Sequence, residues 1–120
     1  MNAHKIVGTW TAATGALIAV VGVVHNLATP MVHREFAALP RADQLMGDAM
    51  FLATGTALVV MGLLTVKAAG AIRAREGWAQ AVAGATAVYS AVLGMAGALL
   101  IPDNPFAYVL ALLGSAQLLV

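Results

Sequence analysis

Four long apolar runs constrain the fold of this chain more than any other feature. They cover about residues 6–28, 46–68, 78–101 and 106–120. Only 9% of the residues are charged and 62% are hydrophobic, whereas soluble domains carry about 25% charged residues. So few charges cannot cover a water-facing surface, and lipid must therefore be the solvent for much of the chain. The sequence predicts an all-α integral membrane protein.

The lengths of the runs indicate how many helices cross the bilayer. A transmembrane helix needs about 20 apolar residues to span about 30 Å of hydrocarbon, and the first three runs meet this requirement. The fourth has only fifteen residues, which reach about 22 Å at about 1.5 Å per residue. The first run is too long for the apolar core of a signal peptide, so we expect it to be retained. We predict one membrane domain, 1–120, built as a four-helix transmembrane bundle.

Lysine and arginine are shared unequally between the two sides of such a bundle. With an even number of helices, the two termini and the second connection lie on one side. That side holds Lys5, Lys67, Arg73 and Arg75, and the opposite side holds Arg34 and Arg41. Because cytoplasmic segments carry the excess of basic residues, we expect cytoplasmic termini and a bacterial inner membrane location.

A faint internal repeat suggests how the helices are grouped. Residues 19–22 resemble residues 91–94 at an offset of 72, and Pro30 aligns with Pro102 at the same offset. This pattern is expected from two helical hairpins of the same topology, each with a proline that ends its first helix. Alanine-rich apolar segments also align by chance, so a bundle without repeats stays open.

Small residues form a stripe along the third run. Ala79, Ala83, Ala87 and Ala91 recur every four residues and so share one helix face. In lipid, such faces allow helix backbones to approach closely. Four short helices enclose little volume, so we expect the chain to form a homo-oligomer through this face.

Polar side chains within or beside the apolar runs lie mostly toward the outer side. His25 lies near the outer end of the first run with Asn26 beside it, and Asp48 precedes the second. Asn104 and Tyr108 lie at the start of the fourth run. Because ionisable groups are costly inside a membrane, such residues indicate a functional site.

His25 and Asp48 each have two interpretations. His25 is either a base or ligand in an outward-opening cavity, or an interfacial histidine that hydrogen-bonds to a neighbouring helix. Asp48 follows Gly47 directly before an apolar run, which favours a helix N-cap. A capping carboxylate could still orient His25. We expect His33 and Glu35 to belong to a solvated loop.

An imidazole and a carboxylate can move protons within one substrate near neutral pH. We therefore hypothesise an enzyme of the isomerase, cyclase or epoxide-opening type that acts on a small apolar molecule entering from lipid. In this hypothesis His25 and Asp48 are catalytic. Asn26, Asn104 and Tyr108 hold the polar atoms of the substrate.

Two other functions stay open at this point. One is a membrane subunit that binds haem, quinone or lipid with His25 as ligand, and the other is a structural or interaction protein without catalysis. Haem is not favoured, because a second intramembrane histidine at matching depth is absent from the sequence. The spacing of the candidate ligands matches no established metal motif, so we predict no metal site and require no cofactor. A net charge of +1 argues against nucleic acid as a partner.

Overall fold

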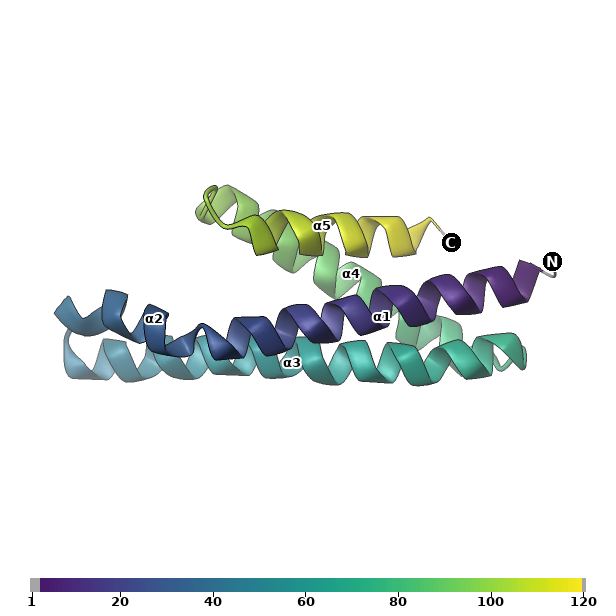
Figure 1. Cartoon of the computed structure of the whole chain (residues 1–120), viewed down its shortest axis with the longest axis horizontal. Helices are drawn as coiled ribbons and strands as arrows, with labels where there is room; N and C mark the ends of the chain where they lie inside the picture. The colour runs from purple at the N-terminus through teal and green to yellow at the C-terminus, as the bar shows by residue number, and fades with distance from the viewer. Residues whose placement is uncertain (1–2, 120) are drawn as a thin grey trace.

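The computed structural model describes residues 3–119, and this part of the chain forms five α-helices and one 3₁₀ helix. They are α1 (Ala3–Leu27), α2 (Thr29–Glu35), η1 (Phe36–Ala38), α3 (Arg41–Arg73), α4 (Gly77–Leu100) and α5 (Pro105–Leu118). The molecule is elongated, with extents of 55 × 22 × 18 Å. Figure 1 shows both termini at one end, which we call the terminal end. The opposite end of the α1–α3 pair, formed by α2, η1 and the start of α3, is called the tip.

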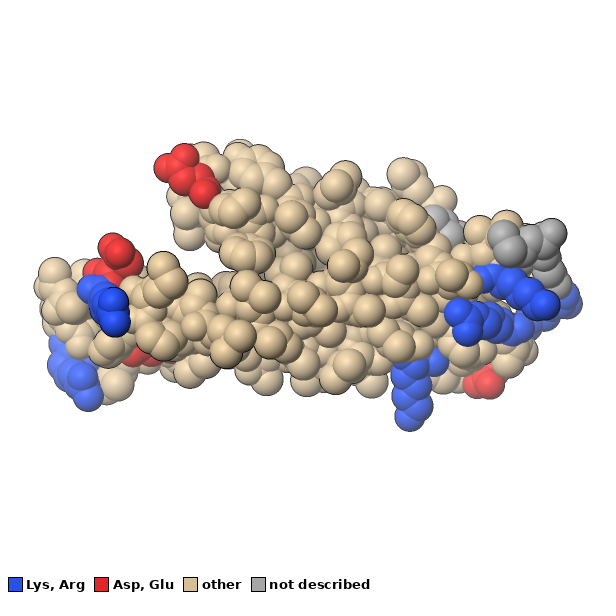
Figure 2. All heavy atoms as spheres, viewed as in Figure 1, with Lys and Arg blue, Asp and Glu red and all other residues tan. Residues whose placement is uncertain are grey.

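Three of these helices are long and apolar enough to cross a membrane, namely α1, α3 and α4. α5 has 14 residues and is a shorter apolar helix; the last residue of its predicted run, Val120, lies outside the described residues. Most charged groups gather toward the two ends of the molecule, and the middle of the visible face is uncharged (Figure 2). The expected all-helical architecture and its fit to a membrane are therefore supported, with three helices of spanning length.

The first connection is more helical than the sequence suggested. α3 begins at Arg41 and ends at Arg73, whereas its predicted range was 46–68. Pro30 lies in the first turn of α2 rather than at the end of α1. Proline is suited to this position, because N–H groups of the first turn have no acceptor within the helix and proline has no N–H. Pro40 directly precedes α3 as its N-cap residue. Asp48 is therefore two turns inside a helix, and its N-cap interpretation is wrong.

Glycine allows α1 and α3 to pack with their backbones in contact. Gly8, Gly15 and Gly22 on α1, and Gly55 and Gly62 on α3, are spaced by seven residues, which is close to two helical turns. A Cβ atom on Gly15 would lie 2.8 Å from the carbonyl oxygen of Gly62, and one on Gly62 would lie 2.6 Å from that of Gly15. No larger residue fits this seam without moving a helix.

The α4–α5 hairpin is packed in the same way. A Cβ atom on Gly94 would contact the backbone of Ala111, and one on Gly114 would lie 2.6 Å from the carbonyl oxygen of Ala87. Ala87 is fully buried and Ala91 is 4% exposed. The small-residue stripe of α4 is therefore covered within the chain, and it does not require a second copy.

Polar and apolar contacts join the two hairpins. Thr65 on α3 donates a hydrogen bond of 2.9 Å to Thr86 on α4, which itself donates to the carbonyl oxygen of Val82 at 3.1 Å. Both threonines are almost fully buried. Toward the terminal end, Ala68 and Ile72 of α3 pack against Ala79 and Ala83 of α4; toward the tip, Ile18, Val21 and Leu58 pack against Leu110 of α5.

The turn between α3 and α4 closes with a Schellman motif. The N–H of Glu76 donates to the carbonyl oxygen of Ala71 at 2.9 Å, and that of Arg75 donates to Ile72 at 3.0 Å. Arg75 adopts the left-handed conformation, with φ 62°, at the position where glycine is usual. This turn reverses the chain within three residues, Ala74–Glu76.

Candidate functional site

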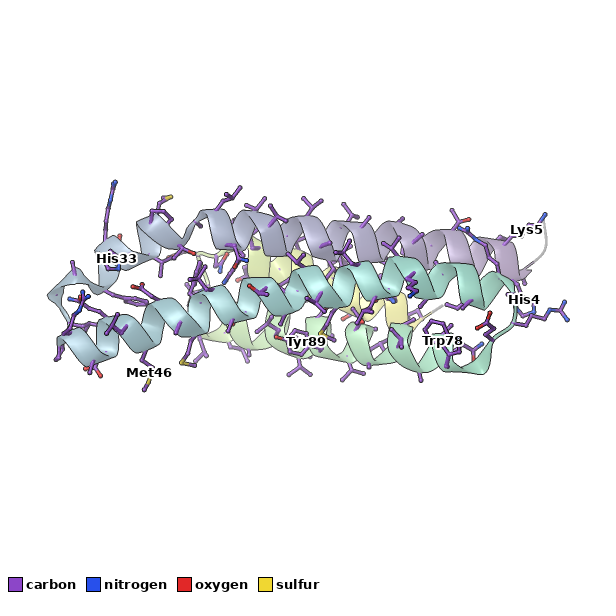
Figure 3. All side chains as sticks on the ribbon, turned by 90° about the horizontal axis from the view of Figure 1, so that it is seen from below. His4, Lys5, His33, Met46, Trp78 and Tyr89 are labelled. Atoms are coloured by element: carbon purple, nitrogen blue, oxygen red, sulfur yellow. The ribbon has the colours of Figure 1, made fainter. Side chains whose placement is uncertain are left out.

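The tip carries a close pairing of two titratable side chains, His33 and Asp48. Figure 1 shows α2 and the first turns of α3 extending past the α4–α5 turn along the long axis. His33 and Met46 lie at this end, whereas Lys5 and Trp78 lie at the other (Figure 3). The tip is therefore formed by the first hairpin alone.

His33 and Asp48 lie within hydrogen-bond distance of each other across the tip. The Nδ1 atom of His33 lies 2.7 Å from Oδ2 of Asp48, and their side chains are 49% and 20% exposed. A carboxylate at Nδ1 favours the tautomer with the proton on that nitrogen, leaving Nε2 as the basic atom. The pair can thus present an oriented imidazole to a molecule at the surface.

The backbone around this pair is held by two further contacts. The amide of Gln44 donates to the carbonyl oxygens of Ala37 and Leu39, at 3.0 and 2.9 Å. The ring of Phe36 lies over Gly47, where a Cβ atom would be only 2.5 Å from ring carbon Cε2. These contacts fix η1 against α3, so the pair is carried by ordered elements rather than by a free loop.

His25 lies one layer deeper and stacks on Phe51. The two ring centroids are 3.7 Å apart and the ring planes differ by 18°. Phe51 follows Asp48 by three residues and so lies on the same side of α3. The Nε2 atom of His25 is buried and has no hydrogen-bond partner among the described residues.

Two other acceptor atoms near this layer also lack partners in the described part of the chain. Asn26 donates to the hydroxyl of Thr56 at 3.3 Å, but its Oδ1 atom is buried against Gly55 without a hydrogen bond. The Oδ1 atom of Asp48 is buried and unpaired as well. Leaving a buried polar atom unpaired costs about 1–3 kcal/mol. Three such atoms along one helix–helix seam call for a functional explanation.

The structure brings three of the predicted site residues together and leaves the other two apart from them. His25, Asn26 and Asp48 lie on the same α1–α3 seam, although Asp48 pairs with His33 instead of His25. Asn104 accepts a hydrogen bond of 3.0 Å from the N–H of Phe106 and so caps α5. Tyr108 is 52% exposed, and neither residue hydrogen-bonds to His25 within residues 3–119.

Sequence reasoning missed the role of His33. It lies fifteen residues from Asp48 on a different helix, and only the antiparallel register of α2 and α3 brings the two together. Within residues 3–119, no group of three or more His, Asp or Glu side chains is arranged to hold a metal ion.

Similarity to known proteins gives no further guide to this site. Comparison of the chain with known protein families, with curated proteins and with solved structures finds no match.

Proposed function

We propose that this protein catalyses acid–base chemistry on a small, largely apolar molecule at the tip of its first hairpin, with His33 and Asp48 as the proton-transferring pair. The main support for this proposal is the distance of 2.7 Å between Nδ1 of the half-exposed His33 and Oδ2 of the less exposed Asp48. The proposal takes the protein to be a four-span bundle in a bacterial inner membrane, with its termini in the cytoplasm and its tip outside. Self-association of the chain is a separate prediction.

The chemistry uses the two nitrogens of His33 for different tasks. Asp48 accepts a hydrogen bond from Nδ1–H, and the free Nε2 removes a proton from a carbon or hydroxyl group of the substrate. The imidazolium formed is stabilised by the carboxylate. Because the His33 side chain is 49% exposed, its proton exchanges with water, and the imidazolium then protonates another atom of the same molecule. An isomerisation or cyclisation of this kind is balanced without an added oxidant or reductant.

Residues deeper in the seam are suited to position the substrate. The unpaired oxygens of Asn26 and Asp48 accept hydrogen bonds from a substrate hydroxyl, and Nε2 of His25 is a further acceptor or proton carrier. Apolar side chains are also exposed at the tip, where Met31, Met46 and Met50 are 64–69% exposed on α2 and α3. Methionine adapts its shape to apolar partners, which suits a substrate that arrives from lipid.

Isotope incorporation tests this function before any substrate has been identified. Purified protein is incubated with an apolar membrane extract in water labelled with deuterium and oxygen-18, and products are identified by mass spectrometry. Proton transfer to carbon introduces deuterium. If Nε2 instead removes a proton from water that opens an epoxide, the added hydroxyl group carries oxygen-18. We expect His33→Gln and Asp48→Asn to reduce label incorporation by about 10²- to 10⁴-fold.

The matched control is Glu35→Gln, which removes an exposed carboxylate from the same short helix. It should leave incorporation unchanged. Equal incorporation by wild type and His33→Gln, or no labelled product with folded wild type, would overturn the proposal.

A further inference from the structure

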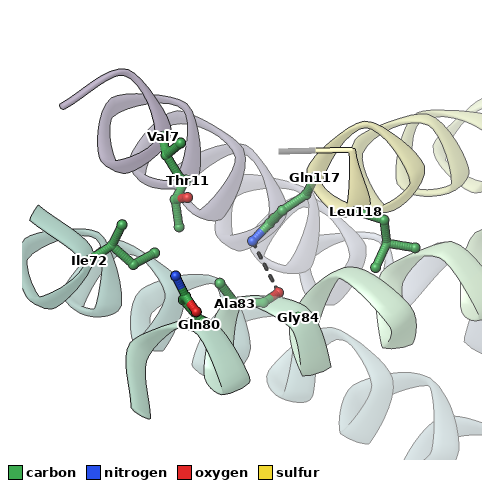
Figure 4. Close-up of a pocket in the computed structure, with 8 residues that line it drawn as sticks. All are labelled: Val7, Thr11, Ile72, Gln80, Ala83, Gly84, Gln117 and Leu118. Carbon is green, nitrogen blue, oxygen red and sulfur yellow. Dashed lines mark hydrogen bonds between the residues drawn. The ribbon is translucent and has the colours of Figure 1, made fainter. Parts of the chain in front are cut away.

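A hollow at the terminal end lies between four helices, far from the His33–Asp48 pair. Its volume is about 340 Å³, within the range of about 300–1,000 Å³ typical of small-molecule sites. Its lining comes from α1, α3, α4 and α5 and comprises Val7, Thr11, Ile72, Gln80, Ala83, Gly84, Gln117 and Leu118 (Figure 4). Most of these side chains are apolar, and none is charged.

Gln117 is the informative residue in this lining. Its side chain is only 7% exposed, and its Nε2 atom donates to the carbonyl oxygen of Ala83 at 3.1 Å. Because a carbonyl oxygen can only accept, this bond fixes which end of the amide faces α4. The Oε1 atom is buried and has no hydrogen-bond partner among the described residues. Since Oε1 can only accept, its missing partner must be a donor.

We propose that this hollow binds a small amphiphile whose hydroxyl group donates a hydrogen bond to Oε1 of Gln117. The apolar body of the ligand lies against Val7, Ile72 and Leu118, and the hydroxyl of Thr11 and the amide of Gln80 offer further polar contacts. A hydroxyl group supplies the donor that an ether, ester or ketone lacks. An anionic head group is disfavoured, because no lining residue carries a positive charge.

Two kinds of membrane molecule share this chemistry, namely a hydroquinone ring and a glycerolipid with a free hydroxyl group. The probes are 2-decylhydroquinone, kept reduced, and 1,2-dioctanoylglycerol. Each has a matched partner without the hydroxyl donor: 1,4-dimethoxy-2-decylbenzene and trioctanoylglycerol. Binding is measured by calorimetry on the protein in lipid nanodiscs, with empty nanodiscs as the blank.

Gly84 lines the hollow and offers a position from which a larger side chain would enter it. A Cβ atom at Gly84 would meet nothing within 4 Å, and the same holds for Gly70 on α3, which does not line the hollow. Gly84→Leu should therefore weaken binding at least tenfold, and Gly70→Leu should leave it unchanged. Gln117→Leu should also weaken binding, by removing the acceptor.

The outcomes separate the sources and decide the proposal. Binding of the hydroquinone alone assigns a quinol-type ligand, binding of dioctanoylglycerol alone assigns a glycerolipid, and binding of both supports the shared chemistry. The proposal is overturned if no hydroxyl probe binds, if the hydroxyl-free partners bind as tightly, or if Gly84→Leu binds as wild type does. Since this site lies at the opposite end from His33, these results are independent of the proposed catalytic function.

Discussion

Gly22 on α1 and Gly55 on α3 face each other so closely that the carbonyl oxygen of each lies against the position of a Cβ atom on the other. A Cβ atom on Gly22 would lie 2.6 Å from the carbonyl oxygen of Gly55, and one on Gly55 would lie 3.0 Å from that of Gly22. At this separation the backbones themselves form the interface. In lipid no hydrophobic effect drives helices together, so close van der Waals contact is expected to stabilise such a pair.

Gly22→Ala should therefore force the first hairpin apart. We expect the free energy of unfolding to fall by about 1–3 kcal/mol, as in overpacked cores. Gly70→Ala is the control, because nothing lies near its Cβ position and alanine favours a helix over glycine by about 0.5–1 kcal/mol. Unfolding in detergent, followed by circular dichroism, measures both. Equal effects of the two substitutions would contradict the close packing.

The hydrogen bond between Thr65 and Thr86 should couple the two hairpins. In a double-mutant cycle with valine at each position, we expect a coupling free energy of about 0.6 kcal/mol, the mean for hydrogen bonds between membrane helices, and at most about 1.7 kcal/mol. Thr54 is the control partner, because its hydroxyl donates to the carbonyl oxygen of Met50 in its own helix. A cycle between Thr54 and Thr86 should give no coupling. A zero value for the Thr65 cycle would rule out the interhelical bond.

Asp48 should fix the tautomer of His33. Nitrogen-15 NMR at a pH where the imidazole is neutral should show the proton on Nδ1 in the wild type. Asp48→Ala should shift the population toward the proton on Nε2, because the acceptor at 2.7 Å is lost. Asp43→Ala changes an exposed carboxylate at the start of the same helix and should leave the tautomer unchanged. An Nε2-protonated wild type would exclude the pairing.

Orientation in the membrane can be tested with single cysteines, because the natural chain has none. The excess of lysine and arginine at the terminal end predicts that this end faces the cytoplasm. A cysteine at Asp43 should react with an impermeant reagent added outside, and a cysteine at Arg75 only after the membrane is opened. The reverse pattern would invert the predicted topology.

The apolar runs predicted the helices well, because such runs depend on the apolar surroundings of a helix and not on how its side chains pack. The ends of α3 were harder to predict, since Asp48 and Lys67 look like boundaries between water and lipid, yet both lie inside the helix. At its Asp48 end, α3 continues because α2 and η1 pack against it. At its Lys67 end, α1 and α4 pack against Ala68 and Ile72.

The site was less predictable than the helices. His25, Asn26 and Asp48 were found because polar groups stand out in apolar sequence, but their partners depend on helix register. The register of α1 on α3 pairs Gly15 with Gly62, and that of α2 on α3 pairs His33 with Asp48. The seven-residue spacing of the glycines was present in the sequence and indicates which faces of α1 and α3 meet.

Each tight hairpin is formed by helices that follow one another along the chain, and this has a consequence for biosynthesis. When Arg73 emerges from the ribosome, every residue of the α1–α3 glycine seam has already been made, and none of it waits for α4 or α5. We therefore expect the chain to insert as two successive hairpins, which are joined afterwards by contacts such as the Thr65–Thr86 bond. Cut within the α3–α4 turn, the gene should encode two fragments that reassemble in the membrane as complementing halves.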